Sequence, residues 1–365
     1  MSIFGNRNQK DAPSPIEPQL PPAPPIDVEA RIREMIALVD PNAHPNSNRL
    51  NELIRNIPLI SLNLKVYGYE LARAMASERP RYDNLTPAKV ELRSKPSTQA
   101  DIESAWVAYW MNRLKAPVVY HRKIWELCYV LQALYNFDLI RPGARGVGFG
   151  CGEEALPSLL ASEGVSVVVT DLEPADDRAK SWQNSGEHTD SLERSFRSDL
   201  VAREAFDRNV SLRRVDMTAI PEDLRDYDFC WSICALEHLG SIAKGLDFIE
   251  NSLDCLKPGG VSVHTTEFNF GDDAQTIDEW PTVLFQKAHF TALAERLRAK
   301  GHQVAELDFD VGTKPLDRFI DLPPWPDDMT PAMRRVYETD TPAHIKLSVD
   351  GFPTTCFGMI VRKAP

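Results

Sequence analysis

The chain has 365 residues, a formal net charge of −12 and 26% charged residues. At about 100–200 residues per domain, this length fits two domains, or one large domain with additions. The acidic balance disfavours bulk nucleic acid as a partner, because affinity for phosphates comes mainly from Lys and Arg. No apolar run approaches the ~18 residues of a membrane span. Met1 to Lys10 also lack the apolar core of a signal peptide.

The six cysteines are scattered and form no Cys-x-x-Cys pair; they stand at positions 128, 151, 230, 234, 255 and 356. This usage argues against a disulfide scaffold and against a zinc ribbon. It is typical of a reducing compartment, so we predict a cytoplasmic protein.

Residues 1–26 contain seven prolines and few large apolar side chains, which predicts a disordered, proline-rich tail. Residues 27–142 read as a mostly helical N-terminal region or cap. Asp27 is the expected N-cap of its first helix, and further helices are expected at 63–77 and at 98–137, with a break at Pro117.

In residues 143–365, short apolar runs alternate with amphipathic segments. We expect strands at 145–149, 165–170, 210–215, 228–233, 261–266, 303–309 and 355–362, and helices at 154–163, 192–207, 241–256 and 287–300. Such alternation predicts an α/β fold with a seven-stranded, doubly wound, Rossmann-like sheet. The last two strands lack a strong helix between them, so the last strand should be antiparallel, with a substrate-side insert at about 310–350.

The sharpest motif is the turn Gly148-Phe149-Gly150-Cys151-Gly152, placed between a strand and a helix. Its glycines permit a tight turn and close approach to a ligand. The third glycine of a dinucleotide fingerprint is replaced by Glu153, and Glu154 follows. Negative charge there opposes a pyrophosphate but tolerates a cation such as the sulfonium of S-adenosylmethionine (SAM). A nicotinamide-dependent sugar enzyme stays as an alternative.

Acidic residues follow the next two strands at the same expected edge. Asp171 ends the second strand about 20 residues after the turn, where a carboxylate can accept both ribose hydroxyls. Asp216 and Met217 end the third strand, where SAM-dependent folds place an acid for the adenine amino group and an apolar neighbour for the ring.

These motifs together resemble the class I SAM-dependent methyltransferases, from Gly143 to the C-terminus. Glu237-His238 and the Leu-Lys-Pro-Gly-Gly turn at 256–260 complete the similarity. The resemblance implies SAM as cofactor, with contacts from Gly148, Phe149, Gly150, Gly152, Asp171, Leu172, Asp216, Met217 and Ser232.

A narrower similarity reaches into the helical region. The segments 99–101, 121–126, 264–269 and 323–325 resemble a bacterial group linked to the biosynthesis of glycans or surface polysaccharides. This similarity implies a glycan-type acceptor without naming one.

Methyl transfer requires alignment of the acceptor and, for a hydroxyl, removal of its proton. His238 follows the fourth strand and titrates near neutral pH, so it is the expected general base, with a loop-ordering role as the alternative. Glu237 would orient His238 or contact the amino group of the cofactor. His264 and Glu267, three apart in the fifth strand, should face opposite sides, and Glu267 is the one expected at the site.

Four further residues are candidates for substrate contact. His121 and Arg122 open a predicted helix, where Arg122 could pair with a carboxylate; a solvated basic turn is the alternative. Trp325 and His344 stand in the insert, and such loops often select the acceptor.

A metal-dependent alternative would resemble the small-RNA ribose methyltransferases, which use a Glu-x-x-Glu-His cluster and a later histidine. Cys234 stands where the first glutamate belongs, leaving Glu237, His238 and His289, so we expect no metal. The main hypothesis is O-methylation of a small or sugar-like acceptor. A non-catalytic SAM-binding scaffold is another alternative, and the oligomeric state stays open.

Overall fold

The computed structural model describes residues 57–174, 191–271, 274–325, 328–337 and 342–365, and the helical positions 29, 32, 33 and 36. The chain divides into two compact units, Met1–Pro58 and Leu59–Pro365. In the first unit, Arg33 lies 3.6 Å from Glu29 one helical turn away. The expected tail at 1–26 lies outside the described residues. The second unit contains the sheet together with the helices that precede it.

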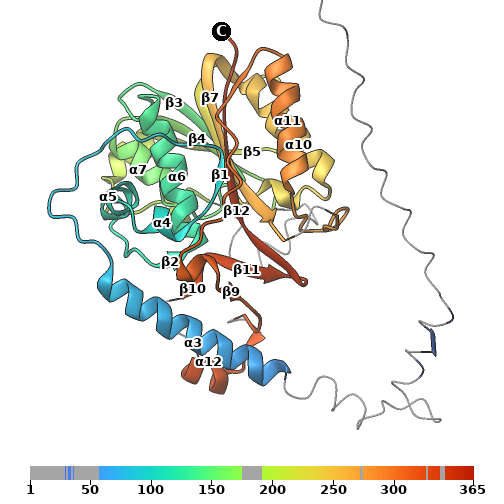
Figure 1. Ribbon diagram of the computed structural model, residues 1–365. Helices are drawn as coiled ribbons and strands as arrows, with labels where there is room; N and C mark the ends of the chain where they lie inside the picture. Colours follow the sequence, from blue (N-terminus) through green and yellow to red (C-terminus); the bar gives the residue numbers. More distant parts are fainter. Residues whose placement is uncertain are drawn as a thin grey trace, which may run out of the picture. The chain divides into compact units, whose positions relative to one another are not determined.

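A mixed sheet forms the centre of the second unit (Figure 1). Its main strands are β3 (Arg145–Phe149), β4 (Ser166–Asp171), β5 (Val210–Arg214), β6 (Tyr227–Ile233), β7 (Leu256–Asn269) and β12 (Phe352–Arg362). They lie in the order β5-β4-β3-β6-β7-β12. The first five are parallel, and β12 runs antiparallel to β7. The Rossmann-like prediction with an antiparallel last strand is confirmed.

The predicted number of strands is wrong, because the sheet has 10 strands within the described residues alone. The additional strands are β1 (Lys95–Pro96), β9 (Ile320–Asp321) and β11 (Lys346–Val349). β1 pairs with β12, whereas β9 and β11 extend the sheet from the insert, which was expected to be a loop.

The strand predicted at 303–309 is also wrong in extent, because β8 covers only Gln303–Val304. Beyond it Ala305 still donates to the Ile360 carbonyl at 3.0 Å, and the chain then leaves β12 and bonds to the segment before β1. Asp308 donates its backbone N–H to the carbonyl of Ser94 at 2.9 Å, and Leu307 forms an isolated bridge with Ser94.

Helices cover both faces of the sheet (Figure 1). One face carries α4 (Gln99–Ile102), α5 (Ala105–Arg113), α6 (Arg122–Asn136), α7 (Leu156–Ser162) and α9 (Arg203–Asn209), and the other carries α10 (Ile242–Ser252) and α11 (Lys287–Ala299). Buried Trp125 and Leu131 of α6 pack in the first layer, and Phe248 and Phe290 pack in the second. Among the described helices, none combines the length and apolarity that a membrane crossing requires.

The helix predicted at 192–207 is wrong as one element. It is replaced by a short 3-10 turn, Leu192–Arg194, and by α9. Ser158 of α7 explains the interruption. Its hydroxyl donates to the carbonyl of Ser195 at 2.7 Å and accepts from the N–H of Arg197 at 2.9 Å. These two bonds hold the chain against α7 where a continuous helix would turn away.

The insert contains β9, α12 (Pro331–Tyr337), β10 (Ala343–His344) and β11, and it is joined to α3 (Ile57–Glu78). Buried Asp321 accepts from Lys65 Nζ at 2.5 Å, from Tyr69 Oη at 3.0 Å and, through the same carboxylate, from His344 Nδ1 at 2.7 Å. β10 pairs with β2 (Tyr120–His121), which leads directly into α6. The insert therefore lies beside the start of α6.

The Asp321 carboxylate is the counter-charge of a fully buried lysine. We expect Asp321→Asn to lower the free energy of unfolding by about 3–5 kcal/mol, because it leaves the Lys65 ammonium buried and uncompensated. Exposed Asp247 of α10 gives a matched control, and Asp247→Asn should change stability by less than about 0.5 kcal/mol. Urea denaturation measures both values. Equal stability of the two variants would contradict the prediction.

Candidate active site

Polar side chains from several strands meet at the edge where the parallel strands end. The glycine turn follows β3, Asp171 ends β4, Asp216 follows β5 and Cys234 follows β6. Carboxyl ends of parallel strands share one edge of a sheet, and ligands of such folds bind there.

The glycine turn fits closely between its neighbours. Gly150 has a φ of +58°, and a Cβ on it would lie 2.8 Å from Ala235 Cβ and 3.4 Å from Met217 Sδ. A Cβ on Gly148 would lie 2.3 Å from the Trp231 ring. The turn, the end of β5 and the end of β6 are therefore adjacent, and only glycine leaves room for the backbone there.

The two carboxylates expected to hold a nucleoside stand beside this turn. Asp171 accepts from the N–H of Leu172 at 2.8 Å, and its carbonyl accepts from the N–H of Val215 at 3.0 Å. Asp216 accepts from the backbone N–H and the hydroxyl of Thr218 at 2.8 and 2.7 Å. Both side chains are partly exposed.

Two residues of the predicted cofactor set point their side chains elsewhere. Phe149 packs on Phe248 under α10, with ring centroids 5.2 Å apart. Ser232 hydrogen-bonds to His264 Nδ1 at 2.8 Å. Any contact that Phe149 or Ser232 makes at the ligand edge must therefore come from its backbone. Burial lowers the pKa of His264 to about 3, so this histidine is neutral.

A group of charged residues, whose three carboxylates are buried, lies at the ends of β6 and β7. It consists of Arg122, Lys123 and Glu126 from the start of α6, Glu237 after β6 and Glu267 in β7, and is called the carboxylate cluster below. Arg122 forms an ion pair with Glu267. Glu126 and Glu237 are 0% exposed, and Glu267 is 3% exposed.

Side chains at β6 and β7 satisfy one oxygen each of Glu126 and Glu237, and Arg122 satisfies one of Glu267. Glu126 Oε2 accepts from the thiol of Cys234 at 2.8 Å and from the hydroxyl of Thr265 at 2.5 Å. Glu237 Oε2 accepts from the hydroxyl of Thr266 at 2.9 Å. The cluster is thereby held in place from both α6 and β7.

The remaining atoms of the cluster are unusual. Across the described part of the chain, four buried side-chain atoms have no hydrogen-bond partner: Arg122 Nε, Glu126 Oε1, Glu237 Oε1 and Glu267 Oε2. Buried polar groups are nearly always paired, and each one left unpaired costs about 1–3 kcal/mol. All four belong to the carboxylate cluster, so this is the place where the fold is prepared for a polar ligand.

Burial also changes the acidity of these groups. It raises the pKa of Glu237 and Glu267, although Lys123 and Arg122 respectively oppose the change. Burial raises the pKa of Glu154 to about 8, against a hydrogen bond from Trp231 Nε1 at 3.0 Å. Glu154 is therefore mostly protonated at pH 7, whereas the sequence suggested a negative charge at this turn. Glu153 pairs with Arg194 at 2.5 Å.

His238 is oriented by the loop between β7 and α11. Its Nδ1 lies 3.0 Å from the carbonyl oxygen of Pro281. A carbonyl only accepts, so Nδ1 carries the proton and Nε2 of the neutral ring is an acceptor. Nε2 lies 3.9 Å from Glu237 Oε1, which places the two candidate proton acceptors beside each other.

Three of the four candidate substrate residues come together beside the start of α6. The His344 ring lies 4.7 Å from His121 and 5.4 Å from Trp325 between ring centroids. His121 Nδ1 accepts from the N–H of Lys123 at 3.1 Å and caps α6. The fourth, Arg122, turns into the carboxylate cluster.

Sequence reasoning did not single out Glu126 as a site residue. The available signal was its spacing, because residues four apart share a helix face, and Arg122 stands four positions before it. Its burial against β7 was not visible in that spacing.

One group among the described residues could offer metal ligands, the Cys234 thiol with the carboxylates of Glu237 and Glu267, whose ligand atoms lie within 4.8 Å of one another. Arg122 already pairs with Glu267, and its Nη1 lies 3.6 Å from Cys234 Sγ. A divalent ion would have to share the space with that guanidinium. His238 and His289 are not members of this group.

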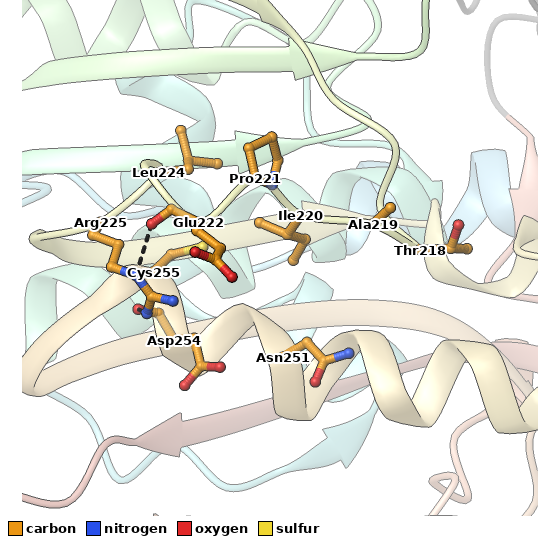
Figure 2. A pocket seen from close by; sticks show the side chains of 10 residues that line it. All are labelled: Thr218, Ala219, Ile220, Pro221, Glu222, Leu224, Arg225, Asn251, Asp254 and Cys255. Carbon is orange, nitrogen blue, oxygen red and sulfur yellow. Dashed lines mark hydrogen bonds between the residues drawn. The ribbon is translucent and has the colours of Figure 1, made fainter.

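A cavity of about 290 Å³ lies elsewhere, between the loop after β5 and the end of α10. Figure 2 shows Glu222 and Arg225 on the loop, joined by a hydrogen bond from Arg225 Nε to the Glu222 carbonyl at 2.7 Å, and Asn251 and Asp254 on the opposite side. No residue of the glycine turn or of the carboxylate cluster lines it, so it is separate from the candidate site.

The raised pKa of Glu154 predicts a pH-dependent stability. Between the ordinary glutamate pKa of 4.5 and about 8, the folded chain binds a proton that the unfolded chain has lost, so stability decreases as pH rises. We expect Glu154→Gln to become more stable relative to the unmodified chain from pH 5 to pH 8, by about 1.4 kcal/mol per pKa unit of the shift. Urea denaturation at several pH values measures this difference.

Exposed Glu295 of α11 supplies the control, since Glu295→Gln removes one carboxylate from the surface. Its stability should run parallel to that of the unmodified chain over the same pH range. A parallel curve for Glu154→Gln would show that Glu154 ionises normally, contrary to the prediction.

Comparison with known proteins agrees with this geometry. A family model described as a methyltransferase domain matches residues 123–307, about half of the chain. No curated protein matches the chain.

Solved structures with similar folds include a candidate sarcosine dimethylglycine methyltransferase from Galdieria sulphuraria, with 14% identity over 72% of this chain and 99% of that chain and a TM-score of 0.40. Another is phosphoethanolamine N-methyltransferase 2 from Haemonchus contortus in complex with S-adenosyl-L-methionine, with 16% identity over 64% and 52% of the two chains and a TM-score of 0.37. Such distant likenesses add nothing on the acceptor. From the family match, the chain belongs to the methyltransferase domain family, as a class I enzyme with S-adenosyl-L-methionine as its cofactor.

Proposed function

We propose that this methyltransferase acts in the cytoplasm on a hydroxyl group of a small or sugar-like acceptor, in keeping with the resemblance to the glycan-linked group. One observation supports it above the others. The glycine turn lies at the same sheet edge as the buried carboxylates of the carboxylate cluster, where three carboxylate oxygens and Arg122 Nε lack hydrogen-bond partners.

The residues present fit the cofactor. Ala235 and Met217 leave no room for a side chain at Gly150, so the turn presents backbone there. Gly148, Gly150 and Gly152 would hold the cofactor through their backbone. Asp171 and Leu172 would hold its ribose, and Asp216 and Met217 its adenine.

The amino-acid end of the cofactor carries a carboxylate and an ammonium group, so its site needs both a positive and a negative side chain. Lys123 lies at the start of α6, 3.9 Å from Glu126 Oε1, so the pair offers a cation for a carboxylate and an acceptor for an ammonium group. Although burial lowers the pKa of Lys123, nearby Cys234 and Glu126 raise it above its usual value. Lys123 is therefore charged at neutral pH.

When bound, the cofactor supplies a methyl group activated by its sulfonium, which passes to the acceptor oxygen and leaves a neutral thioether. The protein has to align the acceptor and take its proton. His238 Nε2 is the acceptor for that proton, and Glu237, 3.9 Å away, stabilises the resulting imidazolium. Glu267 is the second candidate base, because burial raises its pKa toward neutrality.

The insert would complete the acceptor side. His121, His344 and Trp325 stand together beside the start of α6. An indole ring offers an apolar face and a polar edge, which suits a sugar. These residues would hold the part of the acceptor that extends away from the carboxylate cluster.

Cofactor binding is testable by calorimetry with S-adenosylhomocysteine. We expect micromolar affinity for the full chain. Asp171→Ala should weaken it about 10- to 100-fold, since hydrogen bonds to a charged group contribute about 1.5–3 kcal/mol. Asp247→Asn should leave it unchanged. Absence of binding to the unmodified chain would end the proposal.

Turnover measurements test whether His238 acts in catalysis and not in cofactor binding. Turnover on a panel of sugars and glycan intermediates is followed by product mass, as the gain of one methylene group. We expect His238→Ala to lower turnover by about 10²–10⁴-fold, the usual contribution of a general base, and to keep the affinity for S-adenosylhomocysteine. Turnover equal to that of the unmodified chain would assign His238 to loop ordering instead.

A further inference from the structure

The unpaired atoms of the carboxylate cluster describe the ligand that would satisfy them. Three are carboxylate oxygens, on Glu126, Glu237 and Glu267, and one is the Arg122 Nε–H. Carboxylate oxygens only accept hydrogen bonds when ionised, and a guanidinium only donates. The cofactor and the acceptor together therefore bring at least three donors and one acceptor, and two of the three oxygens, on Glu237 and Glu267, are left for the acceptor.

The charge of the cluster adds a second requirement. Its three carboxylates face two cations, Arg122 and Lys123, so full ionisation leaves one excess negative charge. An uncompensated charge in a buried site costs several kcal/mol. The raised pKa values of Glu237 and Glu267 reflect that cost. A positively charged ligand removes it, whereas a phosphate or carboxylate on the ligand would increase the repulsion.

The spacing of Glu237 and Glu267 with neighbouring Cys234 admits a nitrogen cation. The ligand atoms of Cys234, Glu237 and Glu267 lie within 4.8 Å of one another. A tetrahedral ammonium with hydrogen bonds of about 2.8 Å keeps its acceptors about 4.6 Å apart, which this limit admits. A tetrahedral metal with bonds of about 2.0–2.3 Å would draw its ligands to about 3.3–3.8 Å, next to the Arg122 guanidinium.

The position of the oxygens separates this ligand from the cofactor. Glu126 is on α6; its Oε2 is already bonded to Cys234 and Thr265, and its free oxygen, Oε1, lies 3.9 Å from Lys123 Nζ. Glu237 and Glu267 lie on the β7 side, bonded to Thr266 and Arg122, and Glu237 is adjacent to the proposed base His238. An ammonium held by Glu237 and Glu267 therefore belongs to the molecule whose hydroxyl faces His238.

We propose, resting on the proposed function, that the acceptor is an amino sugar or related polyol with a free primary amine. Its ammonium group is held by Glu237 and Glu267, and a neighbouring hydroxyl is presented to His238. The amine binds and orients the acceptor, and the hydroxyl is the group that is methylated.

Calorimetry on the full chain saturated with S-adenosylhomocysteine tests this assignment. Four probes share one sugar ring: glucosamine, N-acetylglucosamine, glucose and glucose 6-phosphate. At pH 7 we expect glucosamine to bind at least tenfold more tightly than the other three. Only glucosamine carries the ammonium, and the N-acetyl group keeps the nitrogen but removes its charge.

Substitutions test whether the ammonium group contacts the carboxylate cluster. We expect Glu237→Gln and Glu267→Gln each to weaken glucosamine binding at least tenfold and to change the affinity for S-adenosylhomocysteine less than threefold. Glu295→Gln, on the exposed face of α11, should change neither. Glu237→Gln leaves the Arg122–Glu267 pair intact, so it remains informative if Glu267→Gln impairs folding.

The possible failures are distinct. If S-adenosylhomocysteine does not bind, the proposed function fails first. If it binds and glucosamine is no tighter than glucose, or glucose 6-phosphate is tighter, only this inference is overturned. Equal weakening of both ligands by Glu237→Gln would assign the carboxylates to the cofactor's own ammonium. Stoichiometric binding of Mn²⁺ or Zn²⁺ that requires Glu237 and is not displaced by glucosamine would replace the amine with a metal.

Discussion

The site depends on the buried ion pair between Arg122 and Glu267. Arg122 is the first residue of α6, and Glu267 stands in β7, so the pair fixes a helix from the N-terminal half to the strand that ends at the ligand edge. A buried pair of this kind is costly to break, because the remaining partner stays charged and desolvated. Once the pair is formed, Lys123 and Glu126 are carried to the same edge by the geometry of α6.

The insert also contacts the start of the same helix. Asp321 accepts hydrogen bonds from Lys65, Tyr69 and His344. The His344 ring packs against His121, the residue that caps α6. The insert is therefore more than a connection between the last two strands. It determines the position of the first turn of α6, and thus of Arg122, through contacts between residues more than 200 positions apart.

The two parts of the site, the glycine turn and the carboxylate cluster, both present carboxylates. Near the glycine turn, Asp171 and Asp216 supply the carboxylates, whereas Glu154 is desolvated and largely neutral at pH 7. The carboxylate cluster adds further carboxylates toward β7. Both halves accept cations more readily than anions. A sulfonium cofactor and an ammonium-bearing acceptor fit this arrangement, whereas a pyrophosphate would be repelled from each.

Local patterns in the sequence determined the central strands, the antiparallel last strand and the glycine turn. Each of these depends on periodicity or on backbone freedom within a few residues, and so do the placements of Asp171 and Asp216 at strand ends. Tertiary contacts decided the rest. Ser158 interrupts the helix expected at 192–207, Ser94 draws the chain away from β8, and β7 buries Glu126. Long-range hydrogen bonds determine which strands pair and where side chains point, and desolvation determines pKa values. Neither produces a periodic pattern in the sequence, so neither could be predicted from it.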